Sequence, residues 1–183
     1  TRGFNQTLRA VASGEEIQRQ PDLWIFEISF KPMRMVWVDG RDPRTGAATR
    51  DQIWYLAYRT VNRSLQARME TSNTTPQNEL DPLPGPSPFL PEFLLSIFDR
   101  PDAQVPESVH LDEVIPAAVA RINQIERRSS SEPPFRNTVE IVQPLPEPVA
   151  EDAENPPWLY GAATWRNIDP ETDFFSITMR GFS

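Results

Sequence analysis

The sequence predicts a mainly β domain, a two-layer antiparallel β-sandwich of the immunoglobulin-like type with one amphipathic helix. Large apolar residues alternate with smaller or polar ones over several short runs, which is the period of a strand. Clusters of Asn, Asp and Pro separate these runs, as in antiparallel sandwiches. Only residues 112–128 have clear helical spacing, so helices do not alternate with strands as a parallel α/β sheet requires. We expect residues 1–20 to form an N-terminal arm and residues 21–183 a single sandwich domain.

The first third of the chain is predicted to hold the arm and a long strand that changes phase. In the arm, Asn5 can cap a short helix ending near Gly14, and a loosely docked segment is the alternative. The following strand has alternating large residues at Trp24, Phe26, Ile28 and Phe30. After Pro32 the large residues take the other parity, at Met33, Met35 and Trp37. A one-residue shift at a proline predicts a bulge or a strand that switches sheets.

The middle of the chain is predicted to contain a central strand. Residues 52–62 are apolar on both parities, as expected for a strand covered on both faces. Residues 65–70 alternate between apolar and polar side chains, which predicts a strand with one solvent-exposed face. A proline-rich loop over residues 72–91 precedes another strand at residues 93–98, and an irregular stretch follows it.

The predicted helix lies within residues 112–128. Its apolar stripe has i, i+3/i+4 spacing and comprises Val114, Ile115, Ala118, Val119, Ile122 and Ile125. Acidic residues at its start and arginines at its end match the helix dipole. Pro116 fits only in the first turn, so the helix is expected to begin near residue 113.

The last third is predicted to contain three strands. Residues 138–142 form a short one, and an acidic, proline-rich crossing leads to the final two, residues 159–166 and 174–181. Residues 167–173 are expected to join these two strands as a hairpin turn.

Two parts of the chain carry a resemblance to a known group. The segment 54–62, Trp-Tyr-Leu-Ala-Tyr-Arg-Thr-Val-Asn, resembles exported bacterial proteins with an immunoglobulin-like sandwich, in which an aromatic-rich strand runs into a Val-x-Asn turn. Residues 161–166 and 174–182 are similar to the final strand pair of that uncharacterised group. The resemblance implies a sandwich fold and a periplasmic or extracellular location in a bacterium. It transfers no catalytic residue, and a signal peptide is not visible in this sequence.

Composition disfavours several classes of function. A net charge of -8 disfavours nucleic-acid binding, because displacing phosphate counterions needs a basic face. The absence of cysteine excludes disulfides, thiolate nucleophiles and Cys-ligated metal sites. No apolar run approaches the roughly 20 residues that span a bilayer. The sequence also has no phosphate-binding glycine loop, dinucleotide fingerprint or nucleophile elbow, so we expect no cofactor.

The candidate catalytic and metal-binding residues all have a simpler structural interpretation. His110 is the only histidine, and we expect a surface or helix-entry residue without a catalytic role. Oxygen ligands that suit a hard cation alternate at Asn167, Asp169, Glu171 and Asp173. The same stretch is a good turn sequence without the glycine of an EF-hand loop, so the turn without a metal is favoured.

The aromatic and acidic residues leave a carbohydrate-related function open. Trp24, Trp37, Trp54 and Trp165 fall in predicted strands, where core packing is the ordinary explanation. Trp158 follows Pro156-Pro157 and is the candidate for an exposed ligand-binding ring. Glu27 and Glu140 are the main acids that the pattern places on inward strand faces. We expect each of them to form an ion pair with an arginine or to lie on a solvent-exposed strand face.

We therefore expect a non-catalytic, extracytoplasmic interaction or structural module with a protein or cell-surface partner. The alternative is a carbohydrate-binding or carbohydrate-cleaving domain that uses exposed aromatics and carboxylates. A concave strip of exposed Trp or Tyr beside carboxylates would distinguish the alternative from the first hypothesis.

Overall fold

The fold is mainly β, with 43% strand and 9% helix arranged as several antiparallel sheets. The computed structural model describes residues 3–19, 23–41, 44–64 and 88–183. The mainly β prediction is confirmed, whereas the immunoglobulin-like sandwich topology is not. The strand predicted at residues 65–70, and most of the proline-rich loop after it, lie outside the described residues.

The larger sheet is organised around one long strand, β4. Its five strands are β1 (Gln6–Leu8), β2 (Ile25–Phe30), β3 (Arg34–Arg41), β4 (Ala48–Arg63) and β9 (Leu159–Arg166). β2 and β3 lie end to end along one edge of β4, and β9 lies along the other edge. β1 adds a short edge strand to β2. The predicted arm thus contributes a strand to this sheet.

A bulge separates β2 from β3. Phe30 is opposite Tyr58 and Arg34 is opposite Tyr55, so three residues on one strand face two on β4. The Lys31 backbone N–H donates to the carbonyl of Ala57 at 2.9 Å and holds the extra residue against β4. The bulge predicted at Pro32 is therefore confirmed.

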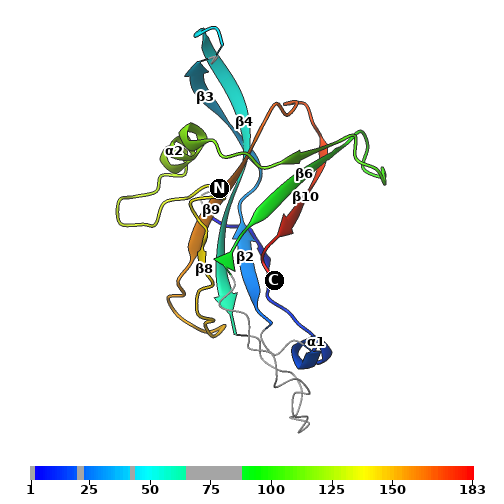
Figure 1. Cartoon of the computed structure of the whole chain (residues 1–183), viewed down its shortest axis with the longest axis vertical. Helices are drawn as coiled ribbons and strands as arrows, with labels where there is room; N and C mark the ends of the chain where they lie inside the picture. Colours follow the sequence, from blue (N-terminus) through cyan, green and yellow to red (C-terminus); the bar gives the residue numbers. More distant parts are fainter. Residues whose placement is uncertain (1–2, 20–22, 42–43, 65–87) are drawn as a thin grey trace.

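Because of the bulge, the even-numbered residues of β3 lie on the opposite face of the sheet from the even-numbered residues of β2. Val36 is buried, whereas Met35 and Trp37 point to the opposite face and are about half exposed. Trp37 is 50% exposed, so the expectation that it packs in the core is wrong. The β3–β4 ribbon extends beyond the rest of the sheet in Figure 1, away from β6 and β10, which form the core with the rest of β4.

The smaller sheet has three strands in the order β10-β6-β7. These are β6 (Glu92–Phe98), β7 (Ser108–Leu111) and β10 (Phe174–Arg180). Two-residue strands, β5 (Pro88–Phe89) and β8 (Gln143–Pro144), form a separate pair. β9 pairs with β4 and β10 pairs with β6, so the predicted hairpin between the last two strands is wrong. Residues 167–173 instead cross from one sheet to the other.

Both faces of β4 are covered, as its apolar sequence predicts. One core cluster contains Phe26 and Leu56 of the larger sheet and Phe93 and Leu95 of β6. A second cluster joins Tyr55 and its neighbours to the helix α2 (Pro116–Ile125). Figure 1 shows α2 on one side of β4, with β6 and β10 on the other. Every residue of β4 from Ile53 to Tyr58 is buried as a result.

The helix predicted within residues 112–128 is confirmed, but it begins at Pro116 and not near residue 113, so the acidic residues expected at its start lie before it. α2 begins with Pro116 in its first turn, where the missing N–H is tolerated. Residues 112–115 are extended because the Asp112 carboxylate accepts hydrogen bonds from the Phe93 N–H and the Thr138 hydroxyl. Arg127 has a left-handed φ of 53°, which ends the helix before residue 128.

Two local predictions are wrong. Residues 138–142 form a turn and not a strand, because the Asn137 side chain accepts the backbone N–H of Val139 and Glu140. The N-terminal helix does not start at Asn5. The helix α1 (Gly14–Arg19) follows Ser13, whose side chain and that of Glu16 form a reciprocal capping box. No helix within the described ranges is long and apolar enough to cross a membrane.

Candidate functional site

The structure gathers one set of predicted site residues around a polar cavity of about 410 Å³. The cavity lies where the ends of β6 and β7 meet the connection from β9 to β10. We call it the acidic pocket, because five carboxylates line it: Asp99, Glu107, Asp169, Glu171 and Asp173. Asn167 lines it as well, so all four candidate cation ligands predicted from the sequence lie at this pocket.

Local hydrogen bonds fix the connection that forms one wall of the acidic pocket. Asn167 takes a left-handed φ of 58°, directly after β9. The Asp169 carboxylate accepts the Glu171 N–H at 2.9 Å, and the Asp169 carbonyl accepts the Thr172 N–H at 3.1 Å. This is the self-bonded geometry of an Asx-type turn, in agreement with the turn predicted from the sequence.

The sequence did not predict that His110 belongs to the same pocket. It lies on β7, where we expected an irregular entry to the helix. His110 is opposite Leu95 and Ser108 is opposite Ile97, so both polar side chains point to the inner side of the smaller sheet. Short, mixed sequences such as Ser-Val-His-Leu give no strong strand signal, and only pairing with β6 reveals the position of the ring.

His110 and Ser108 form a hydrogen-bonded pair, with 2.9 Å between the ring Nε2 and the Ser108 Oγ. A serine hydrolase also needs a carboxylate that orients the other ring nitrogen and donors for an oxyanion. Within the described residues, the His110 ring has a hydrogen bond only with Ser108. The pair is therefore part of a polar lining and does not form an assembled triad.

The electrostatics of the acidic pocket favour cationic groups. No lysine or arginine lines it, and none of its five carboxylates takes part in an ion pair among the described residues. A concave surface with charges of one sign concentrates counter-ions of the other sign. The described residues contain no group of three His, Asp or Glu side chains placed to hold a metal ion.

An apolar sheet face adjoins the acidic pocket. We call it the outer face, because its side chains point away from the larger sheet and from the buried Phe93 and Leu95. Its apolar members are Leu94, Phe98, Val109, Leu111 and Phe174. None of these five belongs to either core cluster, and Val109 and Leu111 are 51% and 59% exposed. Phe98 and Phe174 also line the acidic pocket, so the two surfaces are continuous.

The tryptophans do not form an exposed aromatic strip. Trp158 is half-buried, with the Arg59 guanidinium 4.0 Å from its ring centroid. The Arg50 guanidinium lies 5.4 Å from the centroid of Trp37. Trp54 and Trp165 are buried in the core. Of the two acids predicted on inward faces, Glu27 forms an ion pair with Arg63 at 3.2 Å, and Glu140 is exposed.

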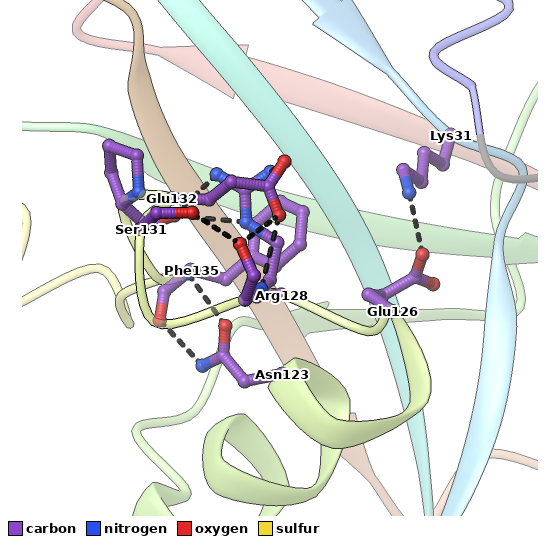
Figure 2. A network of polar contacts seen from close by, with 9 residues as sticks. Lys31, Asn123, Glu126, Arg128, Ser131, Glu132 and Phe135 are labelled. Carbon is purple, nitrogen blue, oxygen red and sulfur yellow. Dashed lines mark hydrogen bonds and ion pairs between the residues drawn. The ribbon is translucent and has the colours of Figure 1, made fainter.

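A buried ionic cluster on the other side of β4 connects the bulge to the end of α2. Glu126 accepts hydrogen bonds from Lys31 Nζ at 2.6 Å, Arg34 Nη1 at 2.9 Å and the Tyr55 hydroxyl at 3.0 Å. Figure 2 shows the Lys31–Glu126 pair at the end of the helix. Lys31 also lies 5.2 Å from the Phe4 ring centroid.

The surroundings of this cluster shift two pKa values. Burial alone would raise the pKa of Glu126, but the hydrogen bonds from Lys31 and Tyr55 and the nearby positive charges outweigh it and lower the pKa. Burial, followed by the charge of Glu126, raises the pKa of Tyr55 to about 12. The cluster is enclosed by core side chains, and we interpret it as a structural link between bulge and helix.

The loop after α2 is fixed by a second set of polar contacts, also visible in Figure 2. The Asn123 amide donates to the Phe135 carbonyl at 3.0 Å and accepts the Phe135 N–H at 2.8 Å. Arg128 and Glu132 form an ion pair at 3.5 Å. These bonds hold the loop against the helix.

No protein-family model, curated protein or solved structure matches this chain, so no activity is transferred to it from a relative.

Proposed function

We propose that this chain is a non-catalytic interaction module that binds a protein partner through the outer face and the acidic pocket. The observation that carries the proposal is their continuity at Phe98 and Phe174, which belong to both surfaces. Contiguous exposed apolar surface beside polar groups is typical of protein-binding sites. The resemblance described above supports an exported bacterial protein with an immunoglobulin-like sandwich, and we include both in the proposal.

The chemistry of the two surfaces defines the partner segment. Apolar side chains would cover Val109 and Leu111 on the outer face, and an arginine or lysine would enter the acidic pocket. Two independent contacts of this kind favour an extended segment with mixed apolar and basic residues. The carbohydrate alternative receives less support, because Trp37 alone among the tryptophans is half exposed and it lies on the β3–β4 ribbon.

Selection from a random-peptide library displayed on phage tests this proposal. Immobilised protein should enrich peptides that combine apolar residues with arginine or lysine. The double variant Asp169→Asn/Asp173→Asn should weaken their binding about tenfold, or about 1.4 kcal/mol. The control Glu147→Gln/Glu154→Gln removes the same charge from exposed acids away from the pocket and should bind normally. Enriched acidic peptides, or equal binding by both variants, would contradict the proposal.

The non-catalytic part of the proposal has its own test. A screen of aryl esters, aryl glycosides and polysaccharides should show no turnover by the purified protein. Turnover that disappears in Ser108→Ala or His110→Ala, while circular dichroism shows an unchanged fold, would establish that the hydrogen-bonded pair is catalytic.

A further inference from the structure

β10 is an edge strand of the smaller sheet. β10 pairs with β6 in unbroken register from Phe174 opposite Phe98 to Arg180 opposite Glu92. Among the described residues, no strand pairs with its other edge. The N–H and C=O groups along such an edge are a template for another strand.

β10 lacks the features that usually protect an edge strand. It spans seven residues, contains no lysine, proline or bulge, and has one charged residue, Arg180, at its end. Other edges of the described sheets are short, charged or, along β9, covered by backbone hydrogen bonds with Arg136 and Glu113. β1 has three residues and β7 has four, whereas β3 carries Arg34, Asp39 and Arg41. A long, uncharged edge would promote uncontrolled association unless it has a specific partner.

We propose that this partner is the β10 of a second copy, paired antiparallel about a two-fold axis at Ile177. The sequence of β10 is self-complementary in this register. Ser176 of one copy faces Thr178 of the other, so that hydroxyls meet hydroxyls on the outer face. Phe175 faces Met179 on the inner side, so that apolar side chains meet. Matched cross-strand pairs of this kind stabilise antiparallel sheets.

Charge complementarity supports the second copy as the occupant. In this register Arg180 of the second copy lies opposite Phe174, which lines the acidic pocket directly after Asp173. Arg180 is exposed and forms no ion pair within the described part of the chain. Each copy therefore supplies a cation to the rim of the other copy's pocket, where it can also contact the Phe174 ring.

The pairing goes beyond the proposed function, because it adds Arg180 of the second copy to the rim of the pocket and extends the outer face over two copies. A two-fold axis perpendicular to the smaller sheet keeps both outer faces on the same side. Two three-stranded sheets would then form one six-stranded sheet with a continuous outer face. Asp99 and Glu107, on the β6–β7 side of each pocket, remain available to a separate partner.

Sedimentation-velocity ultracentrifugation of the full chain at increasing concentrations tests the pairing. The wild type should form a reversible dimer with a Kd below about 200 µM, which corresponds to a weak complex. Both Ser176→Lys/Thr178→Lys and Ser176→Glu/Thr178→Glu should be monomeric, because like charges face each other across the axis. An equimolar mixture should recover the dimer, since each lysine then faces a glutamate.

A matched control separates edge pairing from association through the outer face. Val109→Lys/Leu111→Lys places the same charges on β7, on the same face but away from the proposed axis, and should leave the dimer intact. A wild type that stays monomeric would overturn the inference. A charge-swapped mixture that stays monomeric while both variants are folded by circular dichroism would also overturn it, as would loss of the dimer only in the β7 variant.

Discussion

Replacing Glu126 with Gln should destabilise the fold strongly, although the residue lies far from the candidate site. The Glu126 side chain is 2% exposed, and it neutralises Lys31, which is 5% exposed. Glu126→Gln leaves the lysine charge buried without a counter-ion. Breaking a buried pair in this way typically costs about 3–5 kcal/mol, and we expect about 3 kcal/mol because Gln can still accept a hydrogen bond from Tyr55.

Urea unfolding at neutral pH measures this loss directly. For a domain of this length, about 3 kcal/mol corresponds to a fall of roughly 6–12 °C in Tm. Glu132→Gln is the matched control, because Glu132 pairs with Arg128 but its side chain is 50% exposed, and exposed pairs contribute about 0–1 kcal/mol. The double variant Lys31→Met/Glu126→Gln should be more stable than Glu126→Gln alone. A loss below about 1 kcal/mol for Glu126→Gln would refute the reasoning.

The pH dependence of stability tests the same cluster. The folded pKa of Glu126 is lowered, so its contribution is present above the unfolded value of about 4.3 and is lost as pH falls through the folded pKa. The difference between wild type and Glu126→Gln should therefore be constant near neutral pH and shrink in acid. Tyr55 has a raised pKa of about 12, so its contribution is present below about pH 10 and is lost as pH rises towards 12.

Two further predictions concern the core and the β9–β10 connection. Gly161→Ala should cost about 3 kcal/mol in thermal unfolding, because a Cβ at this position would lie 2.2 Å from Cζ of the fully buried Tyr58. Gly3→Ala, with open space around it, should cost almost nothing. Calcium should leave the Tm unchanged, and a saturable rise that Asp169→Ala or Asp173→Ala abolishes would reveal the cation site that we do not expect.

The features that the sequence predicted correctly depend on local patterns. The change of parity at Pro32 marks a bulge because side-chain direction alternates strictly along a strand. The apolar run in β4 indicates cover on both faces for the same reason. Residues 138–142 show the limit of this approach. Their β-branched residues favour a strand, but the side chain of Asn137 satisfies the backbone in a turn instead.

The site was predicted only in part because its assembly depends on contacts between distant segments. The turn chemistry of residues 167–173 is visible in the sequence, so four of the pocket residues were identified as candidates. Asp99, Glu107 and His110 were not linked to them, because β10 was expected to pair with β9. Once β10 pairs with β6, the ends of β6 and β7 lie beside that connection. Strand pairing over long sequence separations carries no local signal.

Nuclear magnetic resonance mapping of a selected peptide on the isotopically labelled protein tests the central claim most directly. A peptide from the phage selection should shift the amide signals of β6, β7 and β10, with the largest changes at Val109, Leu111 and Phe174. High salt should weaken the binding, because the acidic pocket contributes through exposed charges. Shifts confined to Met35 and Trp37 on the β3–β4 ribbon, with no change in the smaller sheet, would contradict the account.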